Sequence, residues 1–178
     1  MRIIGGKNKG KKLKEFKGDS IRPTSDRAKE ALFNILGQSV YECNFLDLCA
    51  GTGSVGLECY SRGASSITFV DVSQESLKLC KENALSIGVT ETFVKSTAEG
   101  FLKGTDKVFD IIFFDPPYEF SEIEKILSIV KERSLLSDGG IFIYEHKSDR
   151  QSVSVSGFEL CDTRKYGIAI FDFYRVLL

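Results

Sequence analysis

The feature that most constrains the fold is a glycine-rich turn that follows an apolar stretch. Residues 44–49, NFLDLC, predict a buried strand, and residues 50–56, AGTGSVG, lead from it into a helix that ends near Arg62. Glycine lets the backbone turn tightly and lets it approach a bound nucleotide without an intervening side chain. A strand, a glycine-rich turn and a helix in this order are typical of the first unit of a Rossmann-like sheet.

Strands and helices alternate along the chain that follows. Further strands are predicted at 66–71, 92–95, 109–114, 141–145, 157–162 and 168–176. The alternation predicts right-handed crossovers and an α/β fold, with a mostly parallel, seven-stranded sheet covered by helices on both faces. The short link between the last two strands predicts a C-terminal antiparallel hairpin. A helix from Ser73 to about Ser86 is expected to bury Leu85.

The N-terminal residues differ in charge from the rest of the chain. Residues 1–30 contain ten basic and four acidic side chains, a net charge of +6, whereas the whole chain has −1. We predict a basic extension over 1–40, made of a short hairpin and a helix that is capped by Thr24 or Ser25 and buries Ile35, and one main domain over 41–178. This asymmetry indicates a polyanionic partner. The candidate phosphate contacts are Arg2, Lys7, Lys9, Lys11, Lys12, Arg22 and Arg27.

The tetrapeptide Asp115-Pro116-Pro117-Tyr118 directly follows the predicted strand 109–114. The two prolines fix their backbone angles and lack an N–H, so they end the strand in a stiff turn. The carboxylate of Asp115 and the carbonyl of Pro116 can accept the two hydrogens of an exocyclic amine, while Tyr118 stacks on the base that carries it. We predict that these four residues form the catalytic centre of an enzyme that modifies an amino group of a nucleobase.

Two classes of cofactor are compatible with the glycine-rich turn. The GxGxxG spacing, with Asp71 twenty residues after Gly51, also matches the dinucleotide fingerprint, so NAD or FAD is an alternative. Asp47, just before the turn, would repel a diphosphate but attract the ammonium and sulfonium of S-adenosylmethionine, which is the predicted cofactor. The predicted cofactor-binding residues are Asp47, Ala50, Gly51, Thr52, Gly53, Asp71, Val72, Ala98, Glu99 and Asp115. Asp71 is expected to bind the ribose hydroxyls and Glu99 the adenine amino group.

Composition excludes several other classes of protein. Five cysteines without CxxC or metal-like spacing predict reduced thiols and no metal site. No apolar run reaches the roughly 20 residues of a membrane helix, and no signal-peptide core is present. We therefore expect a cytoplasmic protein without a membrane partner, and a monomer because no spare apolar helix is evident. His146, the single histidine, is expected in a loop after the strand at 141–145.

Motifs in the N-terminal third add a resemblance to a known family. RIIGG at 2–6, RPTSDR at 22–27 and EALFN at 30–34, together with DLCAGTG and DPPY, resemble the bacterial RsmD family over essentially the whole chain. The resemblance implies a class I S-adenosylmethionine-dependent methyltransferase. It also implies that the target is the N2 amine of a guanine in 16S ribosomal RNA, in the small ribosomal subunit or its assembly intermediate. The residues themselves indicate an amine but do not distinguish guanine N2 from adenine N6 or cytosine N4.

Three alternative functions stay open from the sequence. A DNA adenine-N6 or cytosine-N4 methyltransferase normally carries a larger target-recognition segment than this chain has room for. An NAD-dependent oxidoreductase has no evident use for the DPPY tetrapeptide. A nucleic-acid-binding module that keeps the cofactor but has lost catalysis would not need that tetrapeptide intact.

Overall fold

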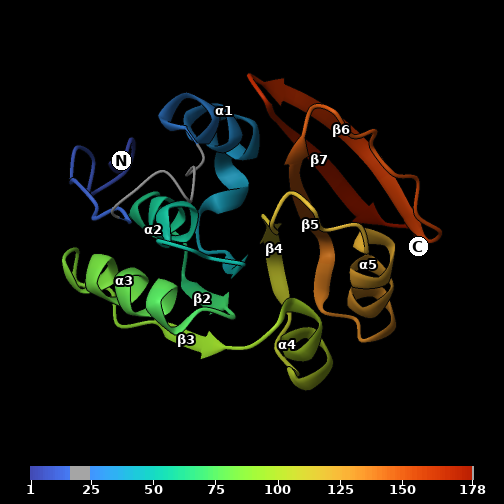
Figure 1. Cartoon of the computed structure of the whole chain (residues 1–178), viewed down its shortest axis with the longest axis horizontal. Coiled ribbons are helices and arrows are strands. Elements are labelled where there is room, and N and C mark those ends of the chain that lie inside the picture. Colours follow the sequence, from blue (N-terminus) through green and yellow to red (C-terminus); the bar gives the residue numbers. More distant parts are fainter. Residues whose placement is uncertain (17–24, 178) are drawn as a thin grey trace.

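The computed structural model describes residues 1–16 and 25–177, and it consists of one sheet between two layers of helices (Figure 1). Across these residues, no helix is long and apolar enough to cross a membrane. The elements in chain order are α1 (Asp26–Leu36), η1 (Gly37–Val40), β1 (Asn44–Leu48), α2 (Ser54–Ser61), β2 (Ser66–Asp71), α3 (Gln74–Leu85), β3 (Thr92–Lys95), α4 (Ala98–Gly104), β4 (Phe109–Phe114), α5 (Ile123–Glu132), β5 (Leu136–Lys147), β6 (Phe158–Tyr166) and β7 (Ala169–Val176).

The seven strands form a single sheet in the order β3-β2-β1-β4-β5-β7-β6. The first five strands of this order are parallel, and β7 runs antiparallel to both of its neighbours. Asp47 of β1 is in register with Phe69 of β2 and with Phe113 of β4, so these three strands end at the same edge. The predicted Rossmann-like α/β sheet with a C-terminal antiparallel hairpin is confirmed.

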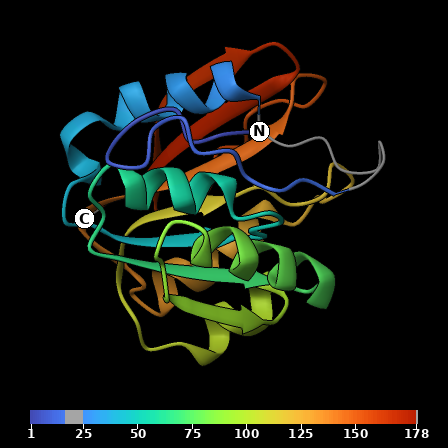
Figure 2. The same ribbon diagram turned by 90° about the vertical axis from the view of Figure 1, so that its left-hand side faces the viewer.

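Each face of the sheet has its own apolar core. Helices α1, α2 and α3 pack on one face, where Leu32 and Leu57 meet Phe113 and Phe171. Helices α4 and α5 pack on the other face, where Leu102 and Leu127 belong to the second cluster. Figures 1 and 2 show the two helical layers on opposite sides of the strands. The alternating side chains of the central strands supply both cores, which explains why these strands are almost wholly apolar.

Two predicted core residues lie outside these cores. Ser25 caps α1 by accepting a hydrogen bond from the N–H of Ala28, and the predicted alternative cap, Thr24, lies outside the described residues. The buried stripe of α1 runs through Leu32 and Leu36, so Ile35 falls at its margin and is 39% exposed. Leu85 is the last residue of α3 and is 56% exposed. The predictions that Ile35 and Leu85 are buried are therefore wrong.

The prediction that His146 lies in a loop is also wrong, because β5 extends to Lys147. Pairing with β7 continues as far as Lys147 and Ala169, which keeps the chain extended beyond residue 145. The His146 side chain is buried, and its Nε2 lies 3.0 Å from Oδ2 of Asp172. Hydroxyl groups of Ser152 and Thr163 donate to the other oxygen of Asp172 at 2.8 and 2.7 Å. Burial raises the pKa of Asp172, but these hydrogen bonds outweigh it and lower the pKa overall.

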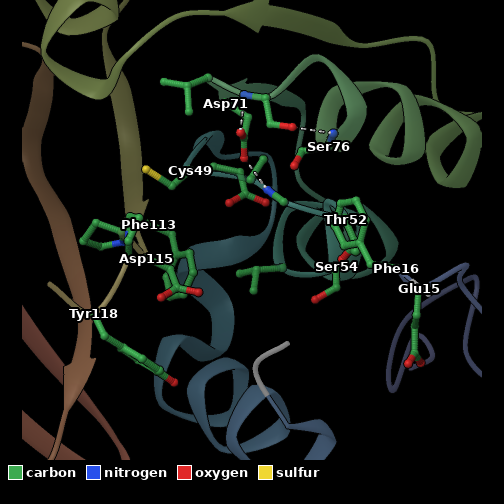
Figure 3. Close-up of a pocket in the computed structure, with 18 of the residues that line it drawn as sticks. Glu15, Phe16, Cys49, Thr52, Ser54, Asp71, Ser76, Phe113, Asp115 and Tyr118 are labelled. Carbon is green, nitrogen blue, oxygen red and sulfur yellow. Dashed lines mark hydrogen bonds between the residues drawn. The ribbon is translucent and has the colours of Figure 1, made fainter. Parts of the chain in front are cut away.

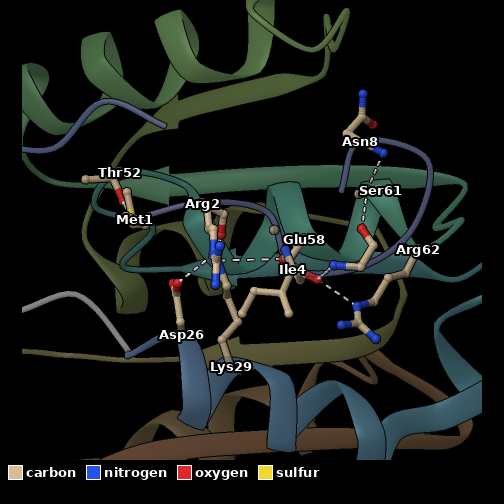
Figure 4. A network of polar contacts seen from close by, with 12 residues as sticks. Met1, Arg2, Ile4, Asn8, Asp26, Lys29, Thr52, Glu58, Ser61 and Arg62 are labelled. Carbon is tan, nitrogen blue, oxygen red and sulfur yellow. Dashed lines mark hydrogen bonds and ion pairs between the residues drawn. The ribbon is translucent and has the colours of Figure 1, made fainter. Parts of the chain in front are cut away.

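The N-terminal segment is held on α2 by a buried carboxylate (Figure 4). The predicted hairpin is present as a short antiparallel pairing, with a bridge between Arg2 and Lys12 and backbone hydrogen bonds from the N–H of Ile3 to the carbonyl of Lys11 and from the N–H of Leu13 to the carbonyl of Met1. Glu58 of α2 accepts hydrogen bonds from the N–H groups of Ile4 and Gly5 at 2.7 and 2.8 Å. It also pairs with Arg62 at 2.8 Å and with the fully buried Lys29 at 3.6 Å. Ile3 and Leu13 enter the same core as the sheet.

Lys29 depends on this carboxylate. Its ammonium is fully buried and donates to the carbonyl of Arg2 at 2.7 Å. Burial lowers the pKa of Lys29, and the charge of Glu58 opposes that fall. Removal of Glu58 would leave a buried cation and two backbone N–H groups without their acceptor.

We predict that Glu58→Ala lowers the free energy of unfolding by about 3–5 kcal/mol, as expected when one partner of a buried ion pair is removed. The measurement is urea unfolding followed by circular dichroism. Glu82→Ala is the control, because Glu82 makes an exposed ion pair with Lys14 of the same segment, and it is expected to change stability little. Equal losses in the two variants would contradict the assignment.

Candidate active site

A cavity of about 540 Å³ opens at the carboxyl ends of β1, β2 and β4 (Figure 3). The strand β1 lies between β2 and β4, so the connections that leave β1 and β4 diverge, and a crevice forms where such connections separate. The described residues that line the cavity are Glu15, Phe16, Asp47, Cys49, Ala50, Gly51, Thr52, Ser54, Val55, Asp71, Val72, Ser73, Ser76, Phe113, Asp115, Pro116, Pro117, Tyr118 and Glu119.

The glycine-rich turn passes directly against its neighbours. Gly53 has a φ of +78°, and a Cβ there would lie 2.4 Å from Sγ of Cys80. A Cβ at Gly56 would lie 2.5 Å from the ring of Phe69. Any larger side chain at these two positions would push α2 away from β2 and α3, so glycine is required for the turn to close.

Two carboxylates fix the turn from inside. The N–H of Gly56 donates to Oδ2 of Asp47 at 2.9 Å, and the N–H of Gly51 donates to Oδ2 of Asp71 at 2.8 Å. The other oxygen of Asp71 accepts from the N–H of Ser73 at 2.8 Å. Asp71 is thereby held at the cavity wall, beside Val72, whose side chain is 59% exposed and lines the cavity. An apolar surface beside an oriented carboxylate suits a ligand with a flat ring and hydroxyl groups.

The cavity is strongly acidic. Its described lining contains the carboxylates of Glu15, Asp47, Asp71, Asp115 and Glu119, and no Lys, Arg or His from the described part of the chain. Burial raises the pKa of Asp47 to about 7; the Gly56 N–H opposes this rise, and the charge of Asp71 adds to it. A phosphate-bearing cofactor would be repelled here, and a cationic ligand would relieve the repulsion.

The tetrapeptide lies across the cavity from the glycine-rich turn. The N–H of Asp115 donates to the carbonyl of Leu48 at 3.3 Å, which continues the pairing of β4 with β1 by one residue. Burial raises the pKa of Asp115 well above its usual range, and the nearby charges of Glu145 and Asp47 raise it further. All four residues of the tetrapeptide line the cavity. Asp115 therefore directly follows the end of a central strand, which gives its carboxyl group a rigid support.

Some predicted cofactor residues lie elsewhere. Gly53, Ala98 and Glu99 are not among the described residues that line the cavity. Both oxygens of Glu99 are engaged, with Lys103 and with Lys125, each at 2.7 Å. The turn before α4 does approach the site, because the N–H of Ser96 donates to the carbonyl of Asp71 at 3.1 Å. The predicted roles of Ala98 and Glu99 in adenine binding therefore rest on the sequence alone.

The structure also adds residues that the sequence analysis missed. Glu15 and Phe16 line the cavity although they are far from it in sequence. The buried side chain of Asn83 in α3 positions them, since its amide oxygen accepts from the N–H of Lys14 at 2.7 Å. Its nitrogen donates to the carbonyls of Lys14 and Thr52 at 3.1 and 3.0 Å. No local sequence pattern predicts this contact, because it joins segments that are distant in the sequence.

The predicted phosphate contacts lie on the N-terminal loop and α1. Lys9, Lys11, Lys12 and Arg27 are exposed, and Arg22 lies outside the described residues. Arg2 pairs with Asp26 at 3.2 Å, and the ammonium of Lys7 lies 3.8 Å from the centre of the Tyr60 ring. Within residues 1–16 and 25–177, no group of three or more His, Cys, Asp or Glu side chains could hold a metal ion.

We predict that Asp47→Asn stabilises the ligand-free protein at pH 8 but has little effect on its stability at pH 4. The pKa of Asp47 is about 7 in the folded chain and near 3.8 when it is unfolded. The folded state therefore holds more protons between these values, and stability falls as the pH rises. The gain at pH 8 should be about 2–4 kcal/mol.

Urea unfolding at pH 4, 6 and 8 measures the effect of this substitution. Asn keeps an oxygen for the N–H of Gly56 and removes the negative charge, while the second carboxylate oxygen is replaced by an NH2 group. Asp106→Asn is the control, since Asp106 is 97% exposed. If Asp47→Asn had the same effect at every pH, the carboxyl group would not have the raised pKa assigned to it.

Comparison with known proteins identifies the family of the chain. The protein-family model described as "Conserved hypothetical protein 95" matches residues 1–175 of this chain. Ribosomal RNA small subunit methyltransferase D of Escherichia coli is 33% identical over 82% of this chain and 74% of its own length. The protein of the same name from Haemophilus influenzae is 29% identical over 98% of this chain and 93% of its own.

The solved structures agree with this assignment. The yhhF protein of Escherichia coli has a TM-score of 0.88 at 28% identity, covering 99% of this chain and 97% of that one. Ribosomal protein L11 methylase from Lactobacillus delbrueckii has a TM-score of 0.65 at 19% identity, covering 84% and 77%, and shows that the fold alone is shared. The chain therefore belongs to the RsmD family, as its N-terminal motifs and its DPPY tetrapeptide implied.

Proposed function

We propose that the protein transfers a methyl group from S-adenosylmethionine to the exocyclic N2 amine of a guanine in 16S ribosomal RNA, in the small ribosomal subunit or an assembly intermediate. The observation that carries the proposal is that the DPPY turn, the glycine-rich turn and several carboxylates line the same cavity. The names of the relatives support the small-subunit RNA as the substrate. The choice of guanine N2 rests on the family resemblance.

The residues of the cavity fit S-adenosylmethionine better than a dinucleotide. Asp71 is oriented to accept from both ribose hydroxyls, because its own bonds to Gly51 and Ser73 leave lone pairs on each oxygen. Val72 offers an apolar surface for the adenine ring, and Asp47 offers a negative charge for the ammonium group. When bound, this cofactor supplies a methyl group on a positively charged sulfur.

The DPPY turn supplies the groups that orient the amine. Bases are turned out of the nucleic acid before enzymes act on them. Asp115 and the carbonyl of Pro116 then accept the two amine hydrogens, which directs the nitrogen lone pair toward the methyl group. Tyr118 stacks on the base. Orientation of this kind accounts for a large part of the rate. The nitrogen loses a proton as it gains the methyl group, and Asp115 is placed to receive it.

We predict that Asp115→Asn lowers the turnover number by at least about a hundredfold, because the amide cannot receive the proton and presents donors to the amine. Affinity for S-adenosylmethionine should change less than about fivefold. Glu119→Gln is the matched control, since Glu119 lines the same cavity and is exposed, and it should retain most of the activity.

The assay is transfer of tritium from methyl-labelled S-adenosylmethionine to small subunits from cells that lack the enzyme, followed by digestion to nucleosides. Calorimetry measures cofactor binding separately. A single N2-methylguanosine peak is expected for the unaltered protein. Label in a different nucleoside would overturn the guanine N2 assignment, and full activity of Asp115→Asn would overturn the role of its carboxylate.

The exposed lysines of the N-terminal loop are proposed to contact the phosphate backbone of the RNA. We predict that replacing Lys9, Lys11 and Lys12 by Gln weakens subunit binding and lowers its dependence on salt. Each lost phosphate contact should reduce the slope of log K against log salt concentration by about 0.7–0.9. Filter binding between 50 and 200 mM salt measures this slope, with cofactor affinity as the control. An unchanged slope would place the RNA on another surface.

A further inference from the structure

Tyr118 is covered by a lysine that the proposed reaction does not use. The Nζ atom of Lys147 lies 4.4 Å from the centre of the Tyr118 ring. Tyr118 lines the cavity, whereas Lys147, the last residue of β5, is not among its described lining residues. The Tyr118 ring therefore contacts both the cavity and the ammonium of a residue outside the cavity lining.

The backbone of Lys147 is held by the buried network around His146. Nδ1 of His146 lies 3.0 Å from the carbonyl oxygen of Lys147, and Nε2 lies 3.0 Å from Asp172. Lys147 also pairs with Ala169 of β7. The ammonium is thus carried by a residue whose main chain is fixed on both sides, in contrast to a lysine on a surface loop.

The other end of the DPPY turn is fixed from the same part of the chain. The guanidinium of Arg150, three residues after Lys147, donates to the carbonyl of Phe120. The ring of Phe120 meets that of Phe114 edge-on, with 5.2 Å between the ring centres. The N–H of Phe120 donates to the carbonyl of Pro117 at 2.9 Å. Residues 147–150 therefore hold the turn at Tyr118 and at Phe120.

We propose that Lys147 is a positioning residue for the target base, acting through Tyr118. Its ammonium attracts the electrons of the ring, which fixes the plane of Tyr118 and makes the cavity side more favourable for stacking with an electron-rich base. This inference rests on the proposed function, because it assumes that a base stacks on Tyr118. The proposed base-binding site then includes Lys147 of β5 in addition to the DPPY tetrapeptide that follows β4.

A double-mutant cycle tests the proposal. Lys147→Met keeps the length of the side chain and removes the charge, and Tyr118→Leu removes the ring. In the otherwise unaltered protein, Lys147→Met should raise KM for small subunits roughly 3- to 30-fold, the range expected for a cation–π contact. In the Tyr118→Leu background the same change should alter KM less than twofold. Lys147→Arg should restore most of the loss.

Binding of subunits in the presence of S-adenosylhomocysteine is measured for the same four proteins. If the protein proves inactive, the proposed reaction is refuted, and the binding data still decide whether Lys147 acts through Tyr118. Lys165→Met is the charge control, because Lys165 is exposed on β6, and any effect it has should be equal in both backgrounds. Equal losses for Lys147→Met in the two backgrounds would indicate a direct phosphate contact and overturn the proposal. An equal loss in cofactor affinity would indicate a structural role and also overturn it.

Discussion

The parallel pairing of β1 with β2 on one side and β4 on the other is the constraint on which the site depends. It brings the carboxyl ends of three strands to one edge, so Asp47, Asp71 and Asp115 face a common cavity although they are distant in sequence. Two of these acids also bond to the glycine-rich turn. The chain therefore uses the same carboxylates to close the turn and to give the pocket its charge.

In the absence of a ligand, this arrangement of carboxylates lowers the stability of the folded chain. Burial is the main cause of the raised pKa values of Asp47 and Asp115, and the charges of neighbouring carboxylates raise them further, so both groups destabilise the folded chain when they are ionised. Energy stored in this way favours binding of a cation, because the ligand relieves a repulsion that water cannot. The apolar cores on both faces of the sheet supply the stability that offsets the repulsion.

Local patterns predicted the elements that depend on local physics. The glycine-rich turn, the caps at Ser25 and Ser73 and the DPPY turn all follow from the backbone preferences of a few neighbouring residues. Contacts between segments that are distant in the sequence could not be predicted from these local patterns. His146 is in a strand because β7 pairs with it. Glu15 reaches the cavity through contacts of its neighbours with distant residues, among them the hydrogen bond from Lys14 to Asn83. Ile35 was misplaced because the apolar pattern of α1 does not show which side chains its neighbours cover, and the buried stripe runs through Leu32 and Leu36 instead.

Asn83 connects the N-terminal segment to the glycine-rich turn. One amide group holds the main chain of Lys14, next to the basic loop, and the carbonyl of Thr52 in the glycine-rich turn. The proposed cofactor site and the proposed RNA-binding loop are therefore linked through one side chain. Wherever a molecule on one region alters the affinity of the other by some factor, the reverse effect must have the same size. Under the proposed function, any coupling between the cofactor and the RNA would therefore be reciprocal, and Asn83 is the buried side chain that the two regions share.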